Sequence, residues 1–161
     1  MERRVFFTGS AAAAIAAAGA TRAFAQEEND NGFVGSWFGT VTATNPPLGQ
    51  FHDLISFHDG SVVTESRRYF VPFTPFGRLL ETTAHGAWKR TGGHSFEAFF
   101  RFLLQNADTG DPVGTDNVRL SLTFDGAHDM LTGTFVSEIK DESDHVVFRV
   151  TGNYSATRIT V

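Results

Sequence analysis

Apolar and polar residues alternate along most of the chain after residue 32, and turn-forming residues separate the alternating segments. A period of two residues is the pattern of a β-strand that buries one face. The segments predict eight strands, at about residues 33–43, 51–58, 61–69, 81–90, 94–105, 117–124, 130–140 and 145–159. This part of the chain has neither a helical period nor an internal repeat.

Short turns join the predicted strands. Asp59-Gly60 and Asp125-Gly126 stand between alternating segments, and Asp-Gly is among the strongest hairpin signals. Glycines also mark the turn at residues 91–93, while a Pro-Pro pair at residues 46–47 ends the first strand because proline cannot donate to a strand ladder. Such short connections favour an antiparallel meander, in which each strand pairs with the next.

We therefore predict an all-β fold made of a single eight-stranded antiparallel up-and-down barrel. Closing the meander into a barrel removes its exposed edges. The alternative is a two-sheet sandwich, which usually needs Greek-key crossings and longer connections. A barrel of this size either fills with side chains or holds one small ligand, and the pattern leaves both possibilities open.

A tryptophan flanked by glycines lies in the first predicted strand, in the sequence GSWFG at residues 35–39. This motif resembles the Gly-x-Trp signature of lipocalins and the wider calycin group, and Arg158 in the last predicted strand matches the arginine of these barrels. The resemblance implies that Trp37 closes one end of the barrel and that Arg158 lies across its indole. It also implies structural roles for Gly35 and Gly39, which let a neighbouring strand approach closely.

Longer segments, from FHDGSVV at residues 57–63 to TGNYSATRI at residues 151–159, are similar to uncharacterised secreted bacterial lipocalin-like proteins. This second resemblance covers most of the chain after the first 25 residues. It implies a fold and an export compartment, and it implies no particular activity.

The same glycine and tryptophan spacing also looks like the start of nitrobindin-type haem barrels. Those barrels continue to a third glycine, where this chain has Val41, and they use a histidine near the C-terminal end as the iron ligand. Residues 154–161 contain no histidine, so we expect no haem and no other cofactor. The six histidines show no His-x-His or His-x3-His spacing, so we expect no metal site either.

The first 25 residues have the features of an export signal. Arg3 and Arg4 form a basic start, an alanine-rich apolar run follows, and Ala23-Phe24-Ala25 fits the small-x-small rule for cleavage. The paired arginines resemble a twin-arginine signal. The alternative is an uncleaved membrane anchor, but the apolar run is too short and too rich in alanine to span a bilayer comfortably.

This interpretation divides the chain into a signal peptide at residues 1–25, a disordered linker at 26–32 and a barrel domain at 33–161. It predicts export across the cytoplasmic membrane to a periplasmic or extracellular location. The chain has no cysteine, so its core has to supply the stability that disulfides often give to exported proteins.

Charge limits the partners of the exported chain. Without Arg3, Arg4, Arg22 and Glu2, the 13 basic and 18 acidic side chains become 10 and 17, which is a net charge of −7. No basic cluster is present, so we expect neither nucleic acid nor an anionic membrane surface as a partner. We also expect no stable insertion into a membrane.

The predicted strand at 94–105 has one wholly apolar face and one mixed face that carries Glu97 and Arg101. With the apolar face inward, these two charges are solvated. With the mixed face inward, they form a buried pair, and Glu97 becomes a candidate general base beside an anion-holding Arg101. Burying two charges is costly, which favours the first orientation. Asp53 and Glu65, on the neighbouring hairpin, are weaker candidates for the same role.

Further candidates lie in the next segments. His85 and Trp88 occupy opposite faces of the predicted strand at 81–90, and the sequence does not decide which face is inward. We keep His85 as a catalytic candidate and Trp88 as a ligand-binding candidate. The segment YFVPFTPFGRLL at residues 69–80 is unusually apolar for a connection, which predicts a lid or a plug over one end of the barrel. The expected ligand-binding residues are Phe70, Phe73, Phe76, Trp88, Phe100 and Phe102.

Two functions fit this sequence. The first is an exported binding protein that holds a small hydrophobic or amphipathic molecule inside the barrel. The alternative is a small barrel enzyme, an isomerase or cyclase that uses Glu97 and Arg101 in an apolar pocket. A homodimer is also possible, because the mixed face at 94–105 would expose Phe99 and Leu103.

Overall fold

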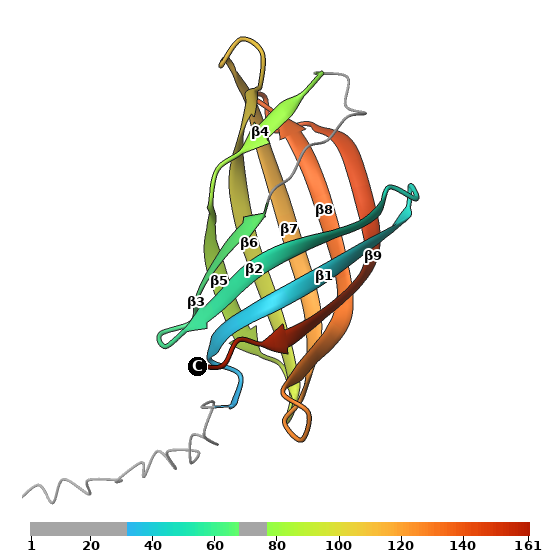
Figure 1. The fold of residues 1–161 in the computed structure, drawn as a ribbon. Coiled ribbons are helices and arrows are strands. Elements are labelled where there is room, and N and C mark those ends of the chain that lie inside the picture. The colour runs from blue at the N-terminus through green and yellow to red at the C-terminus, as the bar shows by residue number, and fades with distance from the viewer. Residues whose placement is uncertain (1–31, 68–76) are drawn as a thin grey trace, which may run out of the picture.

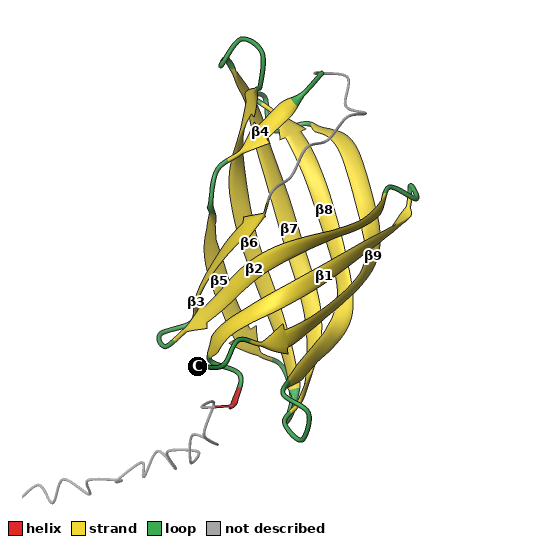
Figure 2. Ribbon diagram, in the orientation of Figure 1, coloured by secondary structure: helices red, strands yellow, loops and turns green. Residues whose placement is uncertain are grey.

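The computed structural model describes residues 32–67 and 77–161, which form one closed antiparallel β-barrel (Figure 1). These residues contain no α-helix, as the all-β prediction requires; the short helical segment drawn before β1 in Figure 2 is a 3₁₀ turn at Gly32. No helix long and apolar enough to cross a membrane occurs in the described residues. The strands are β1 (Gly35–Asn45), β2 (Gly49–His58), β3 (Val62–Arg67), β4 (Leu79–Glu81), β5 (Ala84–Arg90), β6 (Ser95–Asn106), β7 (Pro112–Asp125), β8 (Met130–Asp141) and β9 (Val146–Arg158).

Eight of these strands make the wall of the barrel. They pair in the order β1, β2, β3, β5, β6, β7, β8 and β9, and β9 then pairs with β1 to close the ring. Closure leaves no free edge among the eight, so the predicted up-and-down barrel is confirmed and the two-sheet sandwich is excluded. The short strand β4 is additional, and it pairs with the end of β6 beyond the stretch that β5 covers.

The prediction of a single strand at residues 81–90 is wrong. Thr82 and Thr83 separate two strands there, β4 and β5. The Thr82 hydroxyl accepts a hydrogen bond from the Leu103 amide of β6 at 3.1 Å, and it donates to the Thr83 carbonyl at 3.0 Å. Side-chain hydroxyls that bond to nearby backbone in this way compete with the strand ladder.

The strand predicted at residues 117–124 is longer than expected and begins at Pro112. Proline is tolerated at the first residue of a strand, where the lack of a backbone N–H costs few hydrogen bonds between strands. The pairing of β6 with β7 also changes register between Leu104 and Gln105, so Pro112 pairs across an irregular step in the ladder.

Aromatic side chains fill the end of the barrel where the first residue of β1 and the last of β9 lie. Phe33 stacks on Phe96 with ring centroids 3.7 Å apart, and it also packs against Phe57 and Trp88. Each of these four side chains is 6% exposed or less. Buried aromatic rings remove large apolar areas from water, so this aromatic floor is a main source of stability for the barrel.

Arg158 contacts several residues of this end of the barrel, where β1 pairs with β9. Its guanidinium carbon lies 4.2 Å from the ring of Trp37, which is the contact that the calycin resemblance implies. The same guanidinium donates to the backbone carbonyls of Val34 and Gly32. Gly35 has φ of 141°, and a Cβ at this position would lie 2.6 Å from an Arg158 nitrogen. Glycine is therefore required both by the backbone and by the arginine.

Candidate functional site

A cluster of polar side chains lies inside the barrel, above the aromatic floor. The strands bring it together from distant parts of the sequence, since every second residue of each strand points inward. We call it the Arg67 cluster, and its members are Asp53 from β2, Glu65 and Arg67 from β3, Glu81 from β4, Asp116 from β7, Ser137 from β8 and Tyr154 from β9. All seven side chains are almost inaccessible to solvent.

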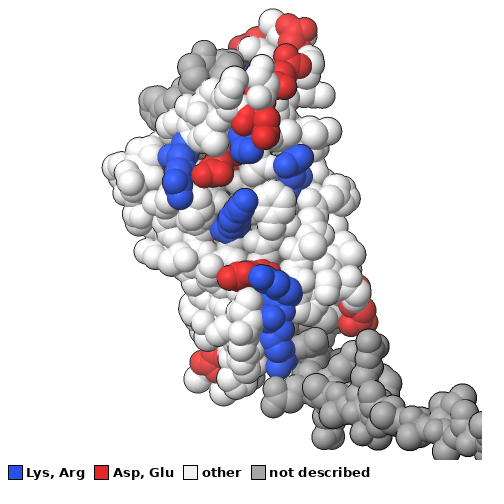
Figure 3. Space-filling model, turned by 180° about the vertical axis from the view of Figure 1, so that it is seen from behind, with Lys and Arg blue, Asp and Glu red and all other residues white. Residues whose placement is uncertain are grey.

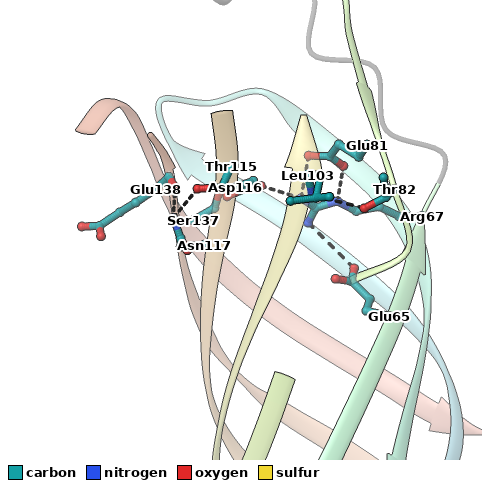
Figure 4. Close-up of polar contacts among 10 residues, drawn as sticks. All are labelled: Glu65, Arg67, Glu81, Thr82, Leu103, Thr115, Asp116, Asn117, Ser137 and Glu138. Atoms are coloured by element: carbon teal, nitrogen blue, oxygen red, sulfur yellow. Dashed lines mark hydrogen bonds and ion pairs between the residues drawn. The ribbon is translucent and has the colours of Figure 1, made fainter. Parts of the chain in front are cut away.

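Arg67 is the centre of the cluster (Figure 4). Its Nε and Nη2 donate to both oxygens of Glu81, at 2.8 and 3.0 Å, and Nη2 also donates to Asp116 at 2.6 Å. Asp116 in turn accepts a hydrogen bond from the Ser137 hydroxyl at 2.7 Å. The guanidinium thus bridges β3, β4 and β7 across the interior, with charge-assisted hydrogen bonds of the strongest kind in proteins.

Two aromatic rings lie close to the guanidinium group of Arg67. Its carbon atom lies 4.1 Å from the Phe102 ring centroid and 5.5 Å from that of Phe51. A desolvated cation over an aromatic face is attracted by about 2 kcal/mol. The position of Arg67 is therefore fixed by rings as well as by carboxylates.

Asp53, Glu65 and Tyr154 form the deeper part of the cluster. The Tyr154 hydroxyl donates to Asp53 Oδ1 at 3.2 Å, and Glu65 lines the same small space. Glu65 Oε1 lies 3.8 Å from Arg67, while Oε2 has no hydrogen-bond partner among the described residues.

Gly39 on β1 makes room for this deeper part. A Cβ at Gly39 would overlap the carboxylate of Asp53 and the hydroxyl of Tyr154. The resemblance to calycins implied that this glycine lets a neighbouring strand approach. The space that it leaves is taken instead by two polar side chains, so Gly39 belongs to the Arg67 cluster rather than to the packing of Trp37.

The cluster holds four carboxyl groups and one guanidinium, so the charges do not balance if every group is ionised. Burial raises the pKa of Glu65 well above its ordinary value; the charge of Arg67 opposes this rise, and the charge of Asp53 adds to it. Burial likewise raises the pKa of Asp53 and of Glu81, the latter against the opposing charge of Arg67. Glu65 therefore keeps its proton to a higher pH than an ordinary glutamic acid.

Little space is left around these groups. A cavity of about 10 Å³ lies beside the deeper part of the cluster, which is room for about one water molecule. Its walls are Val41, Phe100, Val118, Leu120 and Phe135, together with Asp53, Glu65, Arg67 and Tyr154. Within the described residues, the middle of the barrel is thus filled by side chains.

The predicted ligand-binding residues fall into two groups. Trp88, Phe100 and Phe102 point into the barrel, where Trp88 donates to the His58 carbonyl at 3.0 Å and Phe102 supports Arg67. The other three, Phe70, Phe73 and Phe76, lie outside the described residues, as does most of the predicted lid.

The predicted catalytic residues lie on the outer wall. Glu97 forms an ion pair with Lys89 at 3.0 Å, and 51% of its side chain is exposed. Arg101 donates to Asn117 at 2.6 Å, and His85, its cross-strand neighbour, is exposed as well. The apolar face of the strand at 94–105 is therefore the inward one, and the structure does not bring these three residues to the Arg67 cluster.

The outer wall of β5, β6 and β7 is the face that lies behind β1 and β2 in Figure 1. Its charged side chains stand singly or in pairs of opposite sign among uncharged ones (Figure 3). A shallow groove of about 430 Å³ runs along it beside Phe99 and Arg119. Phe99 and Leu103 are 37% and 58% exposed, which is the geometry that the predicted homodimer requires. The dimer itself stays a prediction.

Sequence reasoning missed Arg67, Glu81 and Asp116. Arg67 and Glu65 are two residues apart on one predicted strand, so the sequence predicts that their side chains point to the same face. The partners of Arg67 could not be predicted, because they come from strands far apart in the sequence. In the described part of the chain, no group of three or more His, Cys, Asp or Glu side chains is placed to hold a metal ion.

Comparison with known proteins adds no name to this site: no family model, curated protein or solved structure matches the chain. The architecture alone, a closed eight-stranded antiparallel barrel, is consistent with a calycin-like fold.

The raised pKa of Glu65 predicts how stability depends on pH. When folding raises the pKa of a carboxyl group, the group stabilises the folded protein most at pH values below its pKa in the unfolded chain. This stabilisation is lost as the pH rises towards its pKa in the folded protein. From about pH 5 upward, we expect the free energy of unfolding to fall by as much as about 1.4 kcal/mol per pH unit for this one proton. Glu65→Gln should flatten the fall, as measured by urea unfolding over a series of pH values.

The matched control is Glu97→Gln, since Glu97 lies on the outer wall and is half exposed. This variant should follow the wild-type pH dependence. Identical slopes for the wild type and Glu65→Gln would show that the Glu65 proton is not linked to folding.

Proposed function

We propose that the protein is an exported, lipocalin-like binding protein that holds a small amphipathic molecule at the end of the barrel opposite the aromatic floor. The polar group of this molecule would lie against the Arg67 cluster. Its apolar part would lie among the side chains between the cluster and that end.

The buried charges of the Arg67 cluster carry this proposal. Taking ions out of water is costly, and apolar residues of similar volume are often as good for stability or better. A barrel that only had to fold could fill its middle as it fills its floor, with aromatic and aliphatic side chains. Four carboxyls around one guanidinium, by contrast, offer a polar group in a ligand several charged partners in a dry environment.

The interior beyond the cluster suits an apolar ligand. Leu79, Leu104 and Ile139 point inward there and are buried, while Phe51 and Phe148 are half-buried and pack against the core. A site with a few polar groups at its base and apolar walls is the usual form of a small-molecule site.

Native mass spectrometry of the protein purified from the compartment to which it is exported tests the proposal. We expect an added mass that is lost on denaturation, and its identity names the ligand. Phe51→Ala should then weaken binding about tenfold, because it removes apolar contact beside Arg67. Phe38→Ala is the matched control, since Phe38 lies on the outer wall and is 45% exposed. A bare mass, with no stabilisation by a panel of amphipathic molecules, would count against the proposal.

A second candidate is a barrel enzyme, an isomerase or cyclase, and Glu65 is the observation that favours it. A carboxyl group kept protonated in an apolar interior is a common form of general acid. Glu97 and Arg101 lie on the outer wall, so an enzyme of this kind would use Glu65 and Asp53 in their place. Turnover of the bound molecule that disappears in Glu65→Gln, with binding retained, would favour the enzyme over the binding protein.

A further inference from the structure

We propose that Asp53, Glu65 and Tyr154 form a binding site for one ammonium-sized monovalent cation. These three residues are the deeper part of the Arg67 cluster, and the test of the cation site needs no knowledge of the proposed ligand.

An unused acceptor marks the site. Glu65 is 1% exposed, yet its Oε2 has no hydrogen-bond partner in the part of the chain that the structure describes. Buried polar atoms almost always have partners, and those that lack one call for an explanation. The cavity of about 10 Å³ lies beside this residue and is also lined by Asp53 and Tyr154, so it offers a water-sized occupant three oxygen-bearing groups.

Charge favours a cation as the occupant. Arg67 is already compensated by Glu81 and Asp116, which it contacts at 2.8 and 2.6 Å. Among the described residues, Asp53 has no ion pair, and Glu65 has a single, longer one with Arg67 at 3.8 Å. Buried carboxylates must either take up protons or acquire a positive partner.

Size and donor chemistry identify the class of cation. Apolar walls, from Val41, Phe100 and Phe135 among others, limit the space to about one water molecule and exclude alkylated amines. Two carboxyl groups and one phenol are too few ligands for calcium, and zinc sites are built mainly from nitrogen and sulfur ligands. An ammonium ion, by contrast, needs only hydrogen-bond acceptors, and Tyr154 can accept a bond while it donates to Asp53.

Proton and cation would compete for this site. While Glu65 is protonated, the site carries one negative charge less and attracts a cation more weakly. As pH rises and Glu65 loses its proton, the two carboxylates attract the cation more strongly. Cation affinity should therefore increase with pH, while the stability of the cation-free protein decreases.

Thermal unfolding of the mature protein in ammonium chloride tests the site, with tetramethylammonium chloride at the same concentration as the oversized control. At about pH 8 we expect a melting temperature about 4 °C higher in ammonium, if the salt exceeds the dissociation constant about tenfold. At about pH 5, where protons occupy the carboxyl groups, the two salts should give the same melting temperature.

Variants separate this site from a general salt effect. Glu65→Gln should abolish the difference between the two salts, and Glu97→Gln on the outer wall should retain it. Should Glu65→Gln fail to fold, Tyr154→Phe serves instead, because it keeps both carboxyl groups and should reduce the difference.

One result would overturn the proposal: equal melting temperatures in the two salts at both pH values, which is the behaviour of a cavity that holds only water. A difference that persists unchanged in Glu65→Gln would overturn it as well.

Discussion

Arg67→Met is expected to lower the free energy of unfolding by about 3–5 kcal/mol at neutral pH, the usual cost of removing one partner from a buried ion cluster. Methionine fills a similar volume, so the loss comes mainly from charge. Without the guanidinium, the carboxyl groups of Glu81, Asp116 and Glu65 lose the positive charge that they contact among the described residues.

Urea unfolding at two pH values checks this expectation. The deficit should shrink at about pH 5, because the carboxyl groups of the variant can then take up protons at lower cost. Arg149→Met is the matched control, since the Arg149 side chain is 61% exposed, and it should change stability by about 0.5 kcal/mol or less. An Arg67→Met protein as stable as the wild type at neutral pH would show that the Arg67 cluster contributes nothing net to the fold.

Gly39→Ala is expected to destabilise the barrel by about 2–3 kcal/mol, the upper range for overpacking of a buried site. The added methyl group would overlap the Asp53 carboxylate and the Tyr154 hydroxyl, which have little space into which to move. Differential scanning calorimetry measures the loss, and Gly93→Ala serves as the control because a Cβ at Gly93 meets nothing within 4 Å.

A double variant shows whether the clash is the cause. Asp53→Ala removes the carboxylate that the new methyl group would meet, so Gly39→Ala should cost much less in that background than in the wild type. Equal costs in the two backgrounds would place the effect of Gly39→Ala in the backbone of β1 rather than in the Arg67 cluster.

Most of the wall of the barrel was predictable because strand periodicity and turn chemistry are local. Asp59-Gly60 and Asp125-Gly126 mark hairpins by their own conformational preference. The departures arise where side chains intervene in the ladder, as Thr82 does between β4 and β5. The hydrophobic pattern of a sequence does not show where a side-chain hydroxyl group replaces a backbone hydrogen bond between strands.

The candidate site was less predictable, because its members meet only through barrel closure. Glu65 and Asp53 were readable as acids on neighbouring strands. The sequence could not predict whether the Glu81 side chain points into the barrel, because this depends on the break between β4 and β5. Asp116 lies in a stretch that resembles a loop in the sequence, and only the longer β7 turns it inward. Gly39 resembles part of a tryptophan signature, and only the structure connects it with Asp53.

The pairing of β1 with β9 sets the order in which this protein can fold. Among the described strands, β1 leaves the ribosome first and β9 leaves it last, so one edge of β1 has no partner until β9 has been made. The hairpins can form as they emerge, but the ring closes only after β9 has been made, and contacts this distant in sequence form slowly. A ribosome-bound chain that lacks β9 thus carries an open strand edge and an exposed Trp37, both of which are targets for chaperones.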